Sequence, residues 1–308
     1  MSDLLKTAMI LQVHKNPDQL NRFIRQLLSE NQADVYVHID QKAYHSMNGA
    51  IVESPHVTVL KQCVSCEWGD ISQVDATLLL LKEVIISNKS YDYVCLRSGQ
   101  DLLVKNGFKS FLKESDNKIF MTYRKLTGKE LGLMNINWPK MTRNRYTSIH
   151  PIRIFRKVFL YLFSKGINLV PNRGYWPEEY HFYKGSQWFT IPLDVAKYIV
   201  EFIENNEWYY QYFKNSLVPD ESFFQTLIMN SPYKDRVLNN NLYFLKWGET
   251  LGERNSPQNL TSNDIDLIVN DNQFFARKFD EAIDSKVIEY FAENVHFEGI
   301  TVRQFLKA

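Results

Sequence analysis

The sequence predicts an α/β fold in which helices flank a mostly parallel central sheet. Three observations lead to this prediction. Short apolar segments alternate with helical patterns along residues 8–98, and polar residues follow directly after these segments. The chain has 308 residues and is 44% hydrophobic, so it can bury a substantial core. Strands that alternate with helices form parallel sheets, and such sheets bind ligands at the carboxyl ends of their strands.

The first β-α-β unit begins near the N-terminus. Residues 8–13 (AMILQV) form a continuous apolar run with a single polar residue, which predicts a buried strand. Asn16, Pro17 and Asp18 follow, and they supply a helix N-cap, a first-turn proline and an acid near the helix dipole. Apolar residues at helical spacing come next, and residues 35–39 predict the second strand.

Further elements continue this alternation. Residues 57–60 predict a short strand, residues 72–87 a helix, and residues 93–96 a strand that leads into residues 98–101 (SGQD). Later predicted elements are a strand at 187–191, helices at 193–204 and 220–229, a strand at 242–245, and two C-terminal helices.

Residues 152–163 form a short, basic and very apolar segment that predicts a helix. Two interpretations stay open. The helix could lie on an anionic membrane surface. Alternatively, it could be a core helix with Arg153, Arg156 and Lys157 at its edge.

Composition excludes several classes of protein. Lys and Arg total 36 and Asp and Glu total 35, and there is no basic stripe, so nucleic acid is not expected as a partner. Residues 1–6 lack the features of a signal peptide, and no apolar window has membrane-spanning length, so we expect a protein of the reducing cytosol. Cys63, Cys66 and Cys95 are then expected to be free thiols, and no second Cys or His pair accompanies Cys63 and Cys66 to form a metal site.

Seven short segments occur in an order that is found in one enzyme family. They are residues 13–15 (VHK), 37–40 (VHID), 68–72 (WGDIS), 96–101 (LRSGQD), 185–189 (GSQWF), 219–224 (PDESFF) and 275–280 (FARKFD). Together they resemble the core-2/I-branching β-1,6-N-acetylglucosaminyltransferase family, which is similar to the peptide O-xylosyltransferases. The resemblance covers residues 8–285 and implies a single domain over residues 1–308. In it, residues 1–124 bind the nucleotide sugar, and residues 125–308 bind the acceptor and carry the catalytic residues.

The resemblance implies a GT-A type, Rossmann-like fold without the usual metal-binding D-x-D motif. The sequence agrees, because the end of the central strand carries only one acid, Asp101, whereas a cation that bridges a diphosphate requires more carboxylates. A literal D-x-D occurs at Asp264 and Asp266, but it opens a helix after Thr261, so we expect its carboxylates to serve the helix N-terminus. No metal or other cofactor is expected.

Without a metal, fixed cations have to neutralise the leaving UDP. The resemblance implies that Arg277 and Lys278 contact the diphosphate, and it suggests Arg254 as a further phosphate ligand, although the residues around Arg254 depart from the family pattern. Without the resemblance, such an Arg-Lys pair is typical of a solvated helix face.

Inversion by direct displacement requires one general base that takes the proton of the acceptor hydroxyl. The resemblance implies that Glu221 is this base and that Asp220 positions the acceptor. Asp101 is the alternative base, because it matches an aspartate of the xylosyltransferase branch. From the residues alone, Asp220 and Glu221 are also compatible with ordinary N-cap chemistry at the start of a helix.

The resemblance assigns the remaining site residues to the two substrates. Val13 and His14, where the chain leaves the first strand, and Asp40, after the second strand, are implied in binding uridine. Trp247 is implied in stacking on the acceptor sugar, since aromatic faces suit pyranose rings, with a core tryptophan as the alternative. Further substrate contacts are implied for Trp68, Gln187 and Trp188.

The function implied by the resemblance is transfer of N-acetylglucosamine (GlcNAc) from UDP-GlcNAc, in β linkage and with inversion, to a carbohydrate acceptor. We expect an enzyme of surface polysaccharide biosynthesis in the cytoplasm, with a lipid-linked acceptor and peripheral contact with the inner face of the membrane. Two alternatives remain. One is a transferase of UDP-xylose or another UDP-sugar, because pocket shape decides the donor. The other is a non-catalytic glycan- or nucleotide-binding protein of the same fold.

Overall fold

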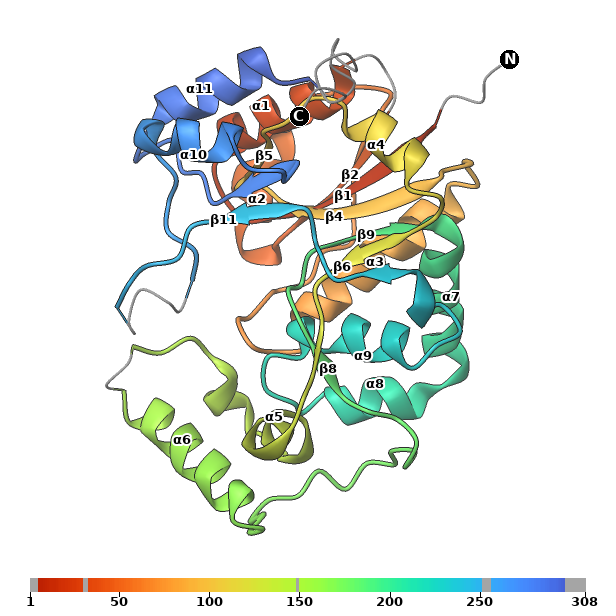
Figure 1. Ribbon diagram of the computed structural model, residues 1–308, viewed down its shortest axis with the longest axis vertical. Coiled ribbons are helices and arrows are strands. Elements are labelled where there is room, and N and C mark those ends of the chain that lie inside the picture. Colours follow the sequence, from red (N-terminus) through yellow and green to blue (C-terminus); the bar gives the residue numbers. More distant parts are fainter. Residues whose placement is uncertain (1–4, 30–32, 148–149, 251–255, 297–308) are drawn as a thin grey trace.

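A seven-stranded sheet forms the centre of the structure, a computed structural model that describes residues 5–29, 33–147, 150–250 and 256–296 (Figure 1). The strand order is β10-β6-β9-β4-β1-β2-β3. The strands are β1 (Thr7–Val13), β2 (Ala33–Ile39), β3 (Val57–Val59), β4 (Tyr93–Ser98), β6 (Ile119–Met121), β9 (Phe189–Pro192) and β10 (Val237–Leu238).

The sheet is mostly parallel, as the sequence predicts. β1 lies between β2 and β4 and runs parallel to both, so that Met9 lies opposite Val35 on one side and Cys95 on the other. β9 is the exception, because it is inserted antiparallel between β4 and β6. The α/β fold with a largely parallel, helix-flanked sheet is therefore confirmed, and it is consistent with the GT-A type.

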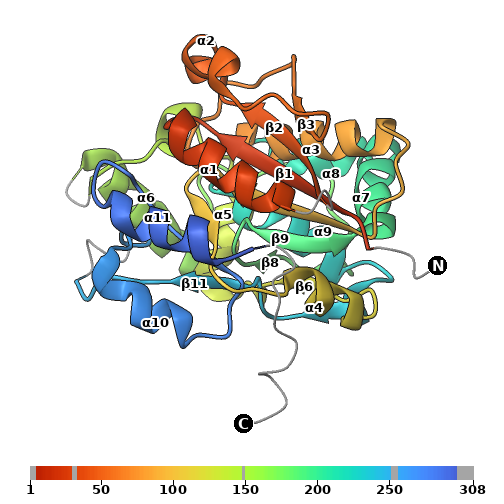
Figure 2. The ribbon, with the colours of Figure 1, turned by 90° about the horizontal axis from the view of Figure 1, so that it is seen from above.

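Helices cover both faces of this sheet (Figures 1 and 2). Alternate side chains of β1 enter two separate cores: Met9 and Leu11 pack on one face, and Ala8 and Ile10 pack on the other. This alternation explains why the run is almost entirely apolar, since a strand that is buried on both faces favours apolar residues on both. The first face packs on α1 (Pro17–Leu28) and α11 (Ser285–Asn294), and the second on α3 (Ser72–Ile86), α7 (Leu193–Asn205), α8 (Glu207–Phe213) and α9 (Phe223–Met229).

The start of α1 differs from the prediction in one detail. Pro17 occupies the first turn as expected, but Asn16 adopts a left-handed conformation with φ 55° and makes no side-chain cap. Its amide instead donates to Asp280 Oδ1 at 3.4 Å. The expected Asn16 cap is therefore wrong, because the side chain reaches the C-terminal part of the chain.

A second sheet joins one strand from the first half of the chain to two strands from its C-terminal part. It has the order β11-β12-β5, and its strands are too short to show a sequence period. β5 pairs antiparallel with β12, which places Arg277 opposite Asp101. The strands of this second sheet are β5 (Asp101–Leu103), β11 (Tyr243–Leu245) and β12 (Phe275–Arg277).

The predicted division of the single domain at residue 124 stays a prediction.

Shorter elements extend from this core. The two-stranded pair β7 (Arg124–Lys125) and β8 (Tyr183–Lys184) leads to the part of the chain that carries α6. The remaining helices are α2 (Tyr44–Met47), α4 (Phe108–Glu114), α5 (Gly132–Asn135), α6 (Pro151–Ser164) and α10 (Ile265–Val269). In the part of the chain that the structure describes, no helix has both the length and the apolar character needed to cross a bilayer.

Helix α6 is not the core helix that one of the two interpretations predicts. All of its residues are described, and Arg156 alone among them is buried. The Arg156 guanidinium donates to the main-chain oxygens of Thr142 and Asn144, so this residue does not lie at the edge of the helix. The core interpretation is wrong because the apolar residues of α6 occupy two faces, and only one of these faces packs on the protein.

Candidate active site

A cavity of about 640 Å³ lies at the carboxyl ends of β1, β2 and β4. It brings together residues that are far apart in the sequence, and most of them are residues that the sequence analysis singles out. Parallel strands that end side by side explain this convergence. The predicted site residues that line the cavity are Val13, His14, Asp40, Trp68, Gln187, Trp188, Arg277 and Lys278.

One wall of the cavity is cationic. Arg145, Arg277 and Lys278 all line it. Burial lowers the pKa of Lys278, and the neighbouring charges of Arg145 and Arg277 lower it further. Burial, followed by the charge of Lys15, also lowers the pKa of His14. A partly buried cluster of like charges is stabilised when an anion binds, so this wall is suited to a diphosphate.

Arg277 lacks the hydrogen bonds that a buried guanidinium requires. Its Nε and Nη1 are buried and have no hydrogen-bond partner among the described residues. The side chain packs over the Trp188 ring with 4.4 Å between the guanidinium carbon and the ring centroid. Because unpaired buried donors are costly, these groups are prepared for an acceptor that the chain itself does not supply.

Asp101 lies directly behind Arg277 and is fully buried. Its Oδ2 accepts hydrogen bonds from the Ser98 amide and the Tyr243 hydroxyl, both at 2.6 Å, and its Oδ1 is 3.6 Å from Arg277 Nε. Burial raises the pKa of Asp101, and the Arg277 charge opposes this effect. The carboxylate therefore orients Arg277 from behind and presents no surface to the cavity.

The end of the cavity beside β2 contains buried polar groups. Asp40 directly follows β2 and is buried, and its Oδ1 accepts a hydrogen bond from the Lys42 amide at 2.9 Å. His38 Nε2 accepts from the Val64 amide at 2.9 Å, and burial lowers its pKa. This histidine is therefore fixed as a neutral acceptor beside Asp40.

Sequence reasoning missed several residues of the cavity wall, among them Gln12 and Arg145. Gln12 accepts a hydrogen bond from Gln187 Nε2 at 2.7 Å and donates to Thr77 Oγ1 at 2.8 Å, so it fixes the orientation of Gln187. The sequence did contain an indication of Gln12, since it is the polar residue among the otherwise apolar residues 8–13. Arg145 lies in a loop without a motif, and no local pattern could have identified it.

Glu221 and Asp220 lie on the short turn η6 (Pro219–Glu221), beside the cavity. The Glu221 carbonyl accepts from the Gly185 amide at 2.8 Å, and the Val218 amide donates to the Gly69 carbonyl at 3.0 Å. The turn therefore lies against the two loops that carry Trp68 and Gln187 into the cavity. Glu221 itself is not among the residues that line it.

The two carboxylates of this turn differ in environment. The side chain of Glu221 is 38% exposed and lies 2.8 Å from Lys184 Nζ. Asp220 Oδ1 is buried and has no hydrogen-bond partner among the described residues. Burial, followed by the negative charge of Glu221, raises the pKa of Asp220 to about 7. A buried carboxyl group with a raised pKa is typical of sites that transfer protons.

Two glycines set the positions of the loops around η6. A side chain on Gly185 would place its Cβ 1.7 Å from the Thr122 carbonyl oxygen, and one on Gly69 would meet the Arg143 oxygen at 2.5 Å. Gly69 also has φ +74°, a conformation that other residues rarely adopt. Glycine is therefore required at both positions by close backbone packing.

Of the remaining predicted residues, Asp101, Asp220, Glu221 and Trp247 do not line this cavity. Trp247 is 51% exposed after β11, so the alternative of a core tryptophan is wrong. Arg254 lies outside the described residues. Trp68 does line the cavity, and the guanidinium carbon of Arg156 lies 5.6 Å from the centroid of its ring.

The literal D-x-D serves a helix start, as predicted. Asp264 forms a capping box with Thr261, and it also pairs with Lys246 at 2.6 Å. Within the described parts of the chain, no group of three or more His, Cys, Asp or Glu side chains could hold a metal ion. Metal independence stays a prediction. Cys63, Cys66 and Cys95 are free thiols, as expected.

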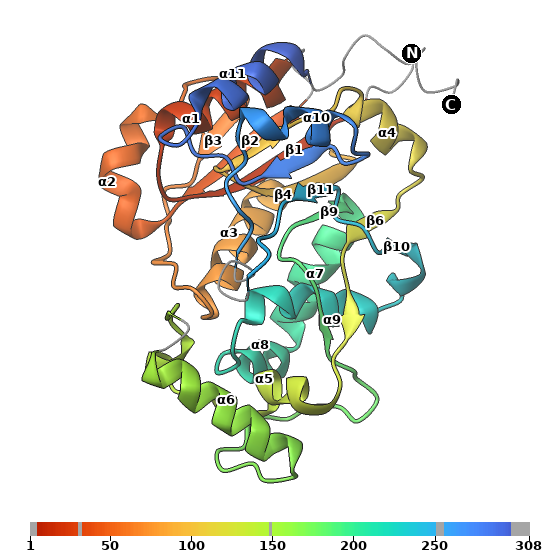
Figure 3. The same ribbon diagram turned by 60° about the vertical axis from the view of Figure 1, so that its left-hand side comes forward.

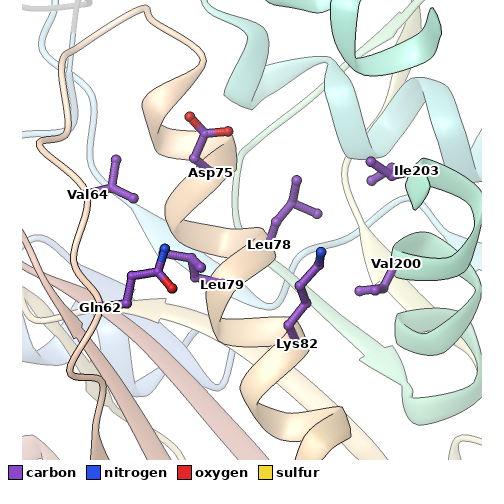
Figure 4. Close-up of a pocket in the computed structure, with 8 residues that line it drawn as sticks. All are labelled: Gln62, Val64, Asp75, Leu78, Leu79, Lys82, Val200 and Ile203. Atoms are coloured by element: carbon purple, nitrogen blue, oxygen red, sulfur yellow. The ribbon is translucent and has the colours of Figure 1, made fainter. Parts of the chain in front are cut away.

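A second cavity of about 330 Å³ lies between α3 and α7 (Figure 4). Its polar lining includes Asp75 and Lys82, which lie along α3, and none of the predicted site residues contributes to it. Asp75 accepts from the Tyr210 hydroxyl at 2.9 Å, and Lys82 pairs with Glu204 at 2.8 Å. Its charged groups are thus already paired, so the cavity at the strand ends is the candidate active site.

The mostly parallel sheet, with a cationic cavity at its strand ends, defines an α/β protein of the kind that binds nucleotide sugars. A model of the Core-2/I-branching enzyme family matches residues 9–269, and the chain belongs to this family.

Individual relatives differ in the sugar that their names specify. The chain is 23% identical over 94% of its length to a mouse (Mus musculus) β-1,3-galactosyl-O-glycosyl-glycoprotein β-1,6-N-acetylglucosaminyltransferase 4. It is 24% identical over 93% of its length to xylosyltransferase 2 of Rattus norvegicus, and 28% identical over 47% of its length to a β-glucuronosyltransferase of Arabidopsis thaliana. The chain spans 65%, 33% and 31% of the lengths of these three relatives, respectively.

Proposed function

We propose that this protein is a glycosyltransferase that transfers GlcNAc from UDP-GlcNAc, with inversion and without a divalent metal, to a glycan acceptor. The observation that carries the proposal is the Arg277 guanidinium beside Lys278 on the wall of the cavity, because its buried Nε and Nη1 have no hydrogen-bond partner among the described residues. Such an arrangement supplies fixed positive charge where the leaving diphosphate develops negative charge. The relative named as an N-acetylglucosaminyltransferase supports the choice of donor.

Two groups of residues hold the donor in this proposal. Val13, His14 and Asp40 bind the uridine, and Arg277 and Lys278 bind the diphosphate, with Arg254 as a further phosphate ligand. Metal independence is supported by the position of Asp101, whose carboxylate is buried and already hydrogen-bonded by two donors. A carboxylate in this state is a poor ligand for a cation in the cavity.

Glu221 is the general base in this mechanism. It takes the proton of the acceptor hydroxyl while that oxygen attacks the anomeric carbon from the face opposite UDP, which inverts the configuration. The exposed carboxylate of Glu221 supports this role. The full burial of Asp101 favours Glu221 over the alternative base, because a base has to reach the proton it removes. Asp220, Trp68, Gln187, Trp188 and Trp247 contact the acceptor or the transferred sugar.

The proposed setting is the synthesis of a surface polysaccharide in the cytoplasm, at the inner face of the membrane, with a lipid-linked acceptor. The cationic wall identifies an anionic donor but not an acceptor, so this part of the proposal is supported only by the character of α6, which is considered below.

Release of UDP from a panel of UDP-sugars tests the proposal. We expect slow hydrolysis of UDP-GlcNAc that persists in excess EDTA, is not increased by manganese, and is abolished by Glu221→Gln. Glu179→Gln, an exposed glutamate away from η6, is the matched control and should retain full activity. Strict dependence on manganese would overturn the metal-free mechanism, and full activity of Glu221→Gln would move the base to Asp101.

The donor panel also tests the alternatives. UDP-xylose and UDP-glucuronate are included because relatives are named for xylosyl and glucuronosyl transfer. Preference for either would replace GlcNAc as the donor and leave the mechanism in place. UDP binding without turnover of any donor, with or without added glycan acceptors, would support a non-catalytic binding protein.

A further inference from the structure

Helix α6 has two apolar faces. On the inner face, Phe159, Leu160 and Phe163 pack against a small buried cluster that includes Trp138. On the outer face, at helical spacing, three other apolar side chains face solvent. They are Ile154 (52% exposed), Val158 (47%) and Tyr161 (61%). A helix on the surface of a globular protein normally needs only one apolar stripe, so the second stripe requires an explanation.

The turn after α6 extends this exposed surface. Ile167, Leu169 and Val170 are all exposed, and they follow the helix directly. Figures 1 and 3 show α6 at the end of the molecule opposite α11, where it projects from the rest of the protein. The outer stripe and this turn form one apolar surface, which we call the α6 surface.

The part of the chain around the α6 surface carries only positive charge. Residues 131–177 contain no Asp or Glu, although the whole protein has nearly equal numbers of acids and bases. Glu130 is the acid on the elements that pack against α6 (η4, α5 and η5), and Arg124 already pairs with it at 2.7 Å. The cations of this segment are Lys140, Arg143, Arg145, Arg153, Arg156, Lys157, Lys165 and Arg173.

We propose that the α6 surface binds the face of an anionic lipid bilayer. The exposed stripe inserts among the lipid chains near the headgroups, and Lys140, Lys157 and Lys165 contact the anionic headgroups. Charge complementarity selects this occupant over a second copy of the chain. Two copies joined through the same surface would bring like charges together, with no acid on that segment to compensate them.

The position of α6 connects this surface to the active site. Arg156, on the inner side of the helix, lies over the ring of Trp68, and Trp68 lines the cavity. The helix that we propose to bind the bilayer with its outer face therefore borders the cavity with its inner side. This inference rests on the proposed function in one respect, because it identifies the acceptor as a glycan carried by that bilayer.

Vesicle flotation of the whole protein tests the proposal. We expect binding to vesicles of phosphatidylcholine with phosphatidylglycerol, and much weaker binding to phosphatidylcholine alone. Each cation at an anionic surface contributes about fivefold in binding, so Lys140→Gln, Lys157→Gln and Lys165→Gln combined should reduce it about 100-fold. The matched control replaces Lys61, Lys113 and Lys197, three exposed lysines on other elements, with glutamine, and should retain binding.

A second variant distinguishes the contribution of apolar insertion to vesicle binding from the contribution of charge. Ile154→Ser combined with Val158→Ser should reduce binding at least about tenfold, whereas Ile86→Ser, at an exposed isoleucine of α3, should not. Circular dichroism and release of UDP with a soluble acceptor verify that each variant is folded and active.

Three results would overturn the inference: equal binding to both vesicle types, an equal loss in the control variants, or a dimer in solution that Ile154→Ser combined with Val158→Ser dissociates. Vesicle binding is measured without a sugar donor, so its outcome is independent of the donor assignment. Vesicle binding by a protein that releases no UDP would refute the proposed function alone.

Discussion

In the proposed function, the candidate active-site cavity has a donor side and an acceptor side, which are built in different ways. The donor side is formed by the ends of β1, β2 and β4, whose positions are fixed by parallel main-chain pairing and by burial on both faces. The acceptor side is formed by the short turn η6 and by loops that are positioned through close contacts at Gly69 and Gly185.

The fold thereby separates two tasks, which are the binding of the nucleotide and the choice of the acceptor. A sheet holds the nucleotide site rigidly, since every strand end is set by its neighbours. Loops can change without changing that sheet, so relatives with the same donor architecture can act on different acceptors. Disruption of the donor side should therefore affect every reaction of the enzyme, whereas changes on the acceptor side should be more selective.

The largest effect is expected on the donor side. Lys278→Gln removes one fixed cation of the diphosphate site, and kcat/KM should fall about 100- to 1000-fold, with weaker binding of UDP. The free energy of unfolding should not fall, because burial and neighbouring cations already lower the pKa of this lysine. Kinetics and calorimetric titration with UDP measure these effects. Lys286→Gln, on α11, is the control, and a parallel loss of stability and activity in Lys278→Gln would contradict the assigned role.

The next-largest effect is expected on the acceptor side, where a substitution displaces a loop. Gly185→Ala forces a Cβ against the Thr122 carbonyl, so the loop that carries Gln187 has to move. We expect a loss of about 3 kcal/mol in the free energy of unfolding and a lower kcat, with UDP affinity largely retained. Gly49→Ala is the matched control, because no atom lies within 4 Å of the added methyl group. Denaturant titration would contradict this prediction if both variants were equally stable.

The same contrast decides what the sequence could predict. The donor side follows from apolar runs and the polar residues that end them, so the parallel sheet and the position of Asp40 at a strand end were predictable from local pattern, whereas the role of Asp40 depended on the family resemblance. The roles of Arg277 and Glu221 depended on the family resemblance. Arg145 lacked both signals, since it is a loop residue that reaches the cavity only through tertiary packing. The antiparallel insertion of β9 was missed for a similar reason, because strand order is set by long-range pairing.

A smaller effect on the acceptor side depends on pH. The pKa of Asp220 in the folded protein is raised to about 7, so folding favours its protonated form. The resulting stabilisation is complete below about pH 4 and is lost as the pH rises through about 7. We expect the free energy of unfolding of the wild type to fall by about 2 kcal/mol over this interval, and Asp220→Asn to reduce that fall.

Denaturant titrations at several pH values measure the effect of Asp220. Asp235→Asn, at an exposed aspartate, provides the control and should leave the pH dependence unchanged. An identical slope in Asp220→Asn and the wild type would show that another group causes the pH dependence.

The smallest effect is expected at Trp247. Its ring is half exposed, so Trp247→Ala should change the free energy of unfolding by less than about 0.5 kcal/mol. If the ring stacks on the acceptor, KM for the acceptor should rise about five- to tenfold while KM for the donor stays constant. Trp208→Ala is the comparison, because Trp208 packs against Trp176 in the aromatic core. Its loss should reduce the free energy of unfolding without a selective change in KM for the acceptor. Equal changes in both KM values for Trp247→Ala would mean that the separation into donor and acceptor sides does not extend to this tryptophan.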